Sequence, residues 1–168
     1  MSWNHELEKA FNAQITLELA SSNRYLALAG WLESAGFPGM AHWMRIQSDE
    51  EREHALRFFQ FVLDRDGGVE VGAIAAPEGS FGSPREVFEA TLRYEKEVTA
   101  AINDLYGLAT DSRDFASFPL LDWFVNEQVE EESGVQQIID DLERAGSEGA
   151  TLLMIDRELG ARSADGAP

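Results

Sequence analysis

The acidic stretch EEREH at residues 50–54 is the most informative part of this sequence about its fold. It lies within a long segment whose apolar residues recur every three to four positions, as they do along one face of an α-helix. Residues three apart on a helix project from the same face, so Glu51 and His54 can bind one metal ion together. A single Glu-x-x-His pair is weak support for a metal site, because acidic helices contain such pairs by chance.

The spacing of this stretch is repeated in the second half of the chain, 77 residues later. In the first half, Glu18 precedes Glu51 by 33 residues and His54 by 36. In the second half, Glu95 precedes the second and fifth residues of the stretch EQVEE, at 127–131, by the same 33 and 36 residues. We interpret the chain as two copies of one metal-binding helical hairpin that face each other.

Helical periodicity extends over four long segments and one short one. The predicted ranges are 4–34, 38–66, 83–110, 118–145 and about 150–159. A short turn at 35–39 makes the first two helices antiparallel neighbours, whereas the connection over 69–82 is unusually long. At roughly 3.3 Å per extended residue, about 15 residues reach ~50 Å, which exceeds the ~42 Å length of a helix of about 28 residues. The sequence therefore predicts an all-α fold of two antiparallel hairpins joined by one long crossover.

Domain organisation follows from the same segments. One domain occupies residues 1–160, and residues 161–168 are expected to form a flexible tail of small residues. Ser83, Pro84 and Glu86 predict a capping box that starts the third long helix.

Polar residues interrupt the apolar face of every long helix at its centre. Four of them are carboxylates, and burying such charges close together costs several kcal/mol per ion, which a domain of ordinary stability cannot sustain uncompensated. Two divalent cations would balance the four charges of Glu18, Glu51, Glu95 and Glu131. Carboxylate oxygens with one imidazole suit iron, manganese or zinc, and a dicarboxylate-bridged pair in a bundle core favours iron or manganese.

Composition excludes several other classes of site. The chain contains no cysteine, so disulfides, thiolate zinc sites and cysteine-ligated iron–sulfur clusters are excluded. The net charge of −18, from 13 basic and 31 acidic residues, disfavours nucleic acid and anionic membranes and favours cationic ligands. No apolar run is long enough for a membrane span, and the N-terminal residues lack the pattern of a signal peptide, so we expect a cytoplasmic protein.

The chain resembles the ferritins, and in particular the bacterial non-haem ferritins. The resemblance covers nearly the whole length and rests on motifs that occur in the same order and at family spacing. These are Glu18 followed by Tyr25, the segment Glu50 to Ala55, Tyr94-Glu95, Asn126-Glu127-Gln128 followed by Glu130-Glu131, and a short fifth helix. The resemblance implies a ferritin-like four-helix bundle with a short fifth C-terminal helix.

The same resemblance implies roles for individual residues. Glu18, Glu51 and His54 would bind a first iron, and Glu51 would bridge to a second iron held by Glu95 and Glu131. Three further carboxylates would join Glu131 at a third iron site: Glu50, Glu127 and Glu130. Two catalytic residues are implied beside the metals, namely Tyr25, which can supply an electron, and Gln128, which would hydrogen-bond to bound oxygen species.

The family's activity is what the resemblance implies for the chain as a whole. It would act as a ferroxidase that oxidises Fe(II) with O2 or H2O2 and stores ferric mineral inside a shell of 24 subunits. Haem is not expected, because Arg52 stands where the haem-binding relatives have a methionine.

Two alternatives remain open from the residues. The first is a diiron oxidase or a manganese catalase, which would share the bundle and the carboxylates but keep the metal as a cofactor. The second is an acidic helical bundle without metal, whose central glutamates would be neutralised by Arg24, Arg45 or Arg52.

Overall fold

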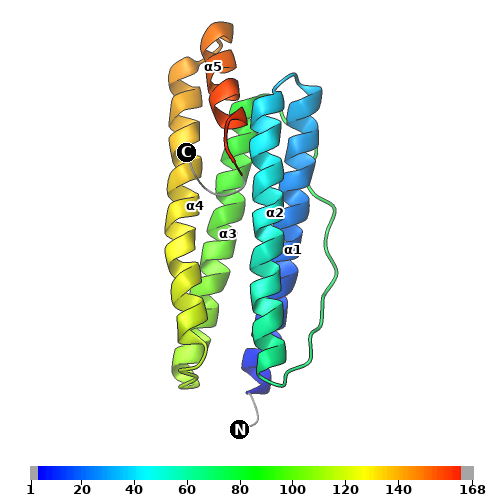
Figure 1. Ribbon diagram of the computed structural model, residues 1–168, viewed down its shortest axis with the longest axis vertical. Coiled ribbons are helices and arrows are strands. Elements are labelled where there is room, and N and C mark those ends of the chain that lie inside the picture. The colour runs from blue at the N-terminus through cyan, green and yellow to red at the C-terminus, as the bar shows by residue number, and fades with distance from the viewer. Residues whose placement is uncertain (1–3, 164–168) are drawn as a thin grey trace.

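The computed structural model describes residues 4–163 and contains, within that range, five helices and no strand. Their bounds are α1 His5–Ser34, α2 Pro38–Asp64, α3 Pro84–Asp111, α4 Phe118–Ala145 and α5 Gly149–Gly160. The four long helices form a bundle, and the short α5 lies at one end of it, beside α2 and α4 (Figure 1). The predicted fold class is confirmed. Within the described residues, no helix is long and apolar enough to cross a membrane.

Local hydrogen bonds explain where the helices begin and end. The side chain of Ser83 accepts the backbone N–H of Glu86 at 3.3 Å, as a capping box requires. The carboxylate of Glu86, however, accepts the N–H of Gly82 at 2.7 Å, which places the second half of the predicted box one residue earlier. Helix α2 ends two residues before the predicted position because Asp66 adopts a left-handed conformation, with φ of 57°.

The long connection between α2 and α3 runs along the whole bundle beside α1 (Figure 1). Its backbone is held by polar side chains of α1. Asn12 accepts the N–H of Glu70 at 2.9 Å, and Thr16 accepts the N–H of Gly72 at 2.9 Å. Near its far end, the ring of Phe81 packs edge-on against Trp31 at 5.9 Å between centroids. The crossover predicted for residues 69–82 is therefore present.

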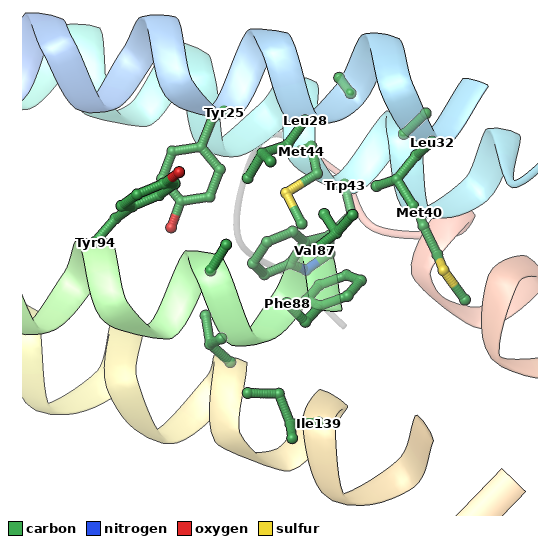
Figure 2. Close-up of a cluster of buried hydrophobic side chains, with 14 of the residues drawn as sticks. Tyr25, Leu28, Leu32, Met40, Trp43, Met44, Val87, Phe88, Tyr94 and Ile139 are labelled. Carbon is green, nitrogen blue, oxygen red and sulfur yellow. The ribbon is translucent and has the colours of Figure 1, made fainter. Parts of the chain in front are cut away.

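The core consists of two apolar clusters, one toward each end of the bundle. One contains Leu28, Leu32, Met44 and Phe88, and Figure 2 shows it with Tyr25 and Tyr94 at one edge. The other contains Leu7, Phe11, Phe58 and Phe124. The buried carboxylates lie along the helices between these clusters, so the polar centre is closed off by apolar packing on both sides.

Helix α5 docks on the first turns of α2 by an unusually close backbone contact. The N–H of Met40 donates to the buried carboxylate of Asp156 at 2.9 Å. A Cβ atom added at Gly39 would lie 1.8 Å from the backbone oxygen of Asp156, and one added at Gly160 would lie 2.9 Å from the Cα of Gly39. Glycine at both positions is thus a condition of this contact.

Replacement of Gly39 by alanine should push α5 away from α2. We expect a loss of about 1 to 3 kcal/mol, the usual cost of forcing an extra carbon into a packed contact, and a lower Tm. Calorimetry and limited proteolysis of α5 would measure both effects. Gly107→Ala is the matched control, because no atom lies within 4 Å of its added Cβ, and it should be neutral or stabilising by up to ~1 kcal/mol. Equal Tm values for the two variants would contradict the expectation.

Candidate metal centre

Three residues at the centre of the bundle offer ligand atoms to one point in space. Glu18 on α1 and Glu51 and His54 on α2 are buried, and one ligand atom from each lies within 4.8 Å of the other two. The Nδ1 atom of His54 is 3.6 Å from a carboxylate oxygen of Glu51. The short α1–α2 turn makes these helices antiparallel neighbours, and the i,i+3 spacing places Glu51 and His54 on the same face.

The carboxylates of this group lack the partners that buried charges need. When both are ionised, one oxygen of Glu18 and both oxygens of Glu51 have no hydrogen-bond donor in the described part of the chain. Gln14 donates to the other oxygen of Glu18 at 2.7 Å. Burial, followed by the nearby charge of Glu51, raises the pKa of Glu18 well above its ordinary value. Burial, followed by the charge of Glu95, does the same to the pKa of Glu51. Unpartnered carboxylate oxygens beside an imidazole fit a divalent cation.

Glu95 and Glu131 face the same centre from α3 and α4, but neutral donors hold them. Glu95 accepts hydrogen bonds from the Tyr25 hydroxyl and, at 3.1 Å, from the Gln128 amide. Burial raises the pKa of Glu95, and these two hydrogen bonds oppose the change.

Glu131 accepts a hydrogen bond from the Gln47 amide at 2.8 Å. Burial and the charge of Glu95 raise the pKa of Glu131 to about 7. Protein donors thus position these two carboxylates without neutralising their charge.

The arginines that could have neutralised the central glutamates bind elsewhere. Arg24 pairs with Glu97 at 2.8 Å, and Arg45 pairs with Glu33 at 3.1 Å. Arg52 is exposed. The structure therefore contradicts the metal-free alternative in which these arginines compensate the buried carboxylates.

A second group of carboxylates lines a pocket of about 370 Å³ next to this centre. It comprises the residues of the predicted third iron site: Glu50, Glu127, Glu130 and Glu131. Glu50, Glu127 and Glu131 are half-buried and Glu130 is exposed, so the pocket is open to the surface. The fold brings these four residues together, and their role as metal ligands stays a prediction.

Two residues of the site were not predicted from the sequence. Gln47 lies on the inward face of α2, and its partner Glu131 is 84 positions away. Arg162 lies in the segment expected to be flexible, yet its guanidinium donates to Gln47 and Glu50. The helical period of α2 places Gln47 on the face toward the bundle interior, but it does not identify the residue with which Gln47 pairs. The rest of that predicted tail, residues 164–168, lies outside the described residues.

The fold and the site together define a class of protein: a four-helix bundle with a crossover between its hairpins and, in its core, a group of carboxylates and a histidine that could hold a metal ion. A family model described as "Ferritin-like domain" matches residues 8–145. The chain belongs to this family.

Individual relatives agree with that assignment over nearly the whole chain. A protein of Bacteroides fragilis named bacterial non-heme ferritin is 39% identical over 159 residues, which are 95% of this chain and 99% of the relative. A probable bacterial non-heme ferritin-like protein of Haemophilus influenzae is 36% identical, with 90% and 92% covered.

Solved structures agree as well. An open pore ferritin of the archaeon Archaeoglobus fulgidus superposes with a TM-score of 0.95 at 37% identity, covering 96% of this chain and 99% of that one.

Proposed function

We propose that this chain stores iron: it oxidises Fe(II) at the buried centre and deposits ferric mineral inside a cytoplasmic shell of 24 copies. The observation that carries the proposal is the set of unpartnered oxygens on Glu18 and Glu51 beside His54, in a chain whose relatives are named ferritins. Iron is the substrate and the cargo of this site. The family relationship supports the shell and its subunit number.

The first Fe(II) would bind to Glu18, Glu51 and His54. Both oxygens of Glu51 lack donors, so this carboxylate is suited to bridge two ions. Glu95 and Glu131 would hold the second Fe(II); Glu95 also accepts hydrogen bonds from Tyr25 and Gln128, and Glu131 accepts one from Gln47. The four carboxylates stabilise Fe(III) more than Fe(II), because the attraction grows with the charge of the cation.

Two side chains next to the metals have separate roles in this proposal. Two Fe(II) ions release two electrons, which reduce O2 to H2O2 or H2O2 to water. Full reduction of O2 to two waters takes four electrons; Tyr25 would supply one of the two that the iron pair does not, and a third Fe(II) the other. The Tyr25 hydroxyl, which donates to Glu95, would also keep that carboxylate oriented. The Gln128 amide, which also donates to Glu95, would hydrogen-bond to oxygen species.

The pocket next to the centre would receive a third iron. Its carboxylates come from Glu50, Glu127, Glu130 and Glu131, and the last of these would also belong to the second iron site. No haem is part of the proposal, because the helix face that would present the haem ligand carries Arg52.

An aerobic Fe(II) titration of the metal-free protein tests the storage function. Ferric absorbance would follow oxidation, and size-exclusion chromatography with iron analysis would give the iron content of the assembled protein. We expect rapid oxidation and hundreds of irons retained in a large soluble particle. Saturation at two or three irons per chain would instead support the alternative, a diiron oxidase that keeps its metal as a cofactor.

A further inference from the structure

We propose that Arg162 is a tethered cation that competes with metal ions for the acidic pocket, so that the third iron binds only after this side chain has been displaced. The inference rests on the proposed function, since it concerns the pocket of the predicted third iron site. In this proposal Arg162, two residues after the end of α5, controls cation binding in the pocket.

The guanidinium of Arg162 makes three contacts along one face of α2. Its Nη2 donates to a carboxylate oxygen of Glu50 at 2.8 Å, and its Nη1 donates to the side-chain oxygen of Gln47. Its central carbon lies 5.0 Å from the centre of the Trp43 ring, in a cation–π contact. Trp43, Gln47 and Glu50 are four and three positions apart, so they form a single row on the helix.

The backbone around Arg162 is also held in place. The Nε2 atom of His42 lies 3.0 Å from the Arg162 carbonyl oxygen, within hydrogen-bond distance. Just before this point, α5 is fixed on α2 by the Asp156–Met40 hydrogen bond and by the contact of Gly160 with Gly39. The docked helix α5 therefore holds the Arg162 guanidinium at the pocket.

Because it is positively charged, the Arg162 guanidinium competes with metal ions for the carboxylates of the pocket. Of the described residues that line the pocket, four are carboxylates and Arg162 is the one cation. Arginine stays protonated at any physiological pH, so Arg162 can pair with Glu50 over that whole pH range. A metal ion that ligates the same Glu50 oxygen must break this ion pair.

A second link connects Arg162 with the buried centre through Gln47. Because the Gln47 oxygen accepts from Arg162, its amide nitrogen is turned toward Glu131, to which it donates at 2.8 Å. Glu131 is shared by the proposed second and third iron sites. Displacement of Arg162 would release Gln47, and with it one oxygen of Glu131, for binding to the third ion. The expected result is ordered filling, with the buried pair first and the pocket last.

Calorimetric titration of the assembled, metal-free protein with Zn(II), which is redox-inert, tests this inference. We expect two tighter sites and one weaker site per chain in the wild type. In Arg162→Gln the weaker site should bind about tenfold more tightly, a change of ~1.4 kcal/mol, with the tighter sites unchanged. Arg162→Lys, which keeps the charge but lacks the planar fork, should fall between the two.

Arg157→Gln is the matched control, because it removes the same charge from an exposed position of α5 that does not line the pocket. It should bind Zn(II) as the wild type does. An unchanged or weaker third site in Arg162→Gln, or no third site in either protein, would overturn the inference. Failure of the proposed function has a different signature: the tighter sites would be missing from the wild type, or would persist in Glu51→Ala.

Discussion

Replacement of Glu51 by alanine is expected to slow aerobic Fe(II) oxidation by about 100-fold or more. Loss of a residue that merely supports a metal ligand commonly costs 10- to 100-fold, and loss of a bridging ligand should cost no less. When Glu18 and Glu51 are ionised, neither oxygen of Glu51 has a donor in the described core, which suits this carboxylate to bridge two ions. His54→Ala should show a similar loss, because it removes the single imidazole of the group.

The measurement is the initial rate of ferric absorbance after Fe(II) is added to the metal-free protein. Glu53→Ala provides the control: it removes the same charge from an exposed position on α2, two residues away. Size-exclusion chromatography establishes that all variants assemble alike. If Glu51→Ala oxidised iron within about threefold of the wild-type rate while Glu53→Ala was normal, the proposed centre would be wrong.

Stability of the metal-free protein should fall as the pH rises from about 5 to about 8. The pKa of Glu131 is raised in the folded chain from the ordinary value of 4.5 to about 7 by burial and the charge of Glu95. Between these two pH values, the folded state retains a proton that the unfolded state has released, so the free energy of unfolding decreases with increasing pH. The full change for this one group is roughly 3 kcal/mol, and burial shifts the pKa values of Glu18, Glu51 and Glu95 in the same direction.

Scanning calorimetry in the presence of a chelator would show this effect as a Tm lower by about 5 °C or more at pH 8 than at pH 5.5. Glu131→Gln should reduce the slope, because the amide has no proton to lose. Glu130→Gln, which removes the same charge from the exposed neighbouring position, should leave most of it. Saturating Zn(II) should restore stability at pH 8, since a bound cation stabilises the folded state that holds it. A Tm that stayed constant or increased with pH would contradict the expectation.

The architecture was largely predictable because it depends on local patterns. Helix α4 occupies the predicted residues, α1 begins one residue later than predicted, and α3 begins and ends one residue later. The inward face of each helix was also foreseen, since a 3.6-residue period requires only that apolar residues recur regularly. The end of α2 was not foreseen, because it depends on the left-handed backbone conformation of a single residue, Asp66, which the helical period does not indicate.

Contacts between distant segments set the limit of what the sequence could predict. The repeated spacing grouped Glu18, Glu51 and His54, and the structure places them within reach of one ion. The same spacing could not tell which donor would hold each carboxylate. Arg162 was the hardest to foresee, because it lies 112 positions from Glu50 and is placed by the backbone contact between α5 and α2.

The crossover along α1 limits how far the two hairpins can slide past each other at the candidate metal centre. The ligands proposed for the iron pair come from both hairpins: Glu18, Glu51 and His54 from the first, and Glu95 and Glu131 from the second. The crossover over residues 69–82 joins the two hairpins from opposite ends of the bundle. Its extended reach of ~50 Å exceeds the ~42 Å of a long helix, but it is fastened to α1 at Asn12 and Thr16, which limits its slack. Sliding one hairpin along the other by a single turn, 5.4 Å, would separate Glu51 from Glu95, and in the direction that lengthens the crossover it would use up most of that excess. The length of this segment therefore limits how far the proposed iron ligands of the two hairpins can move apart.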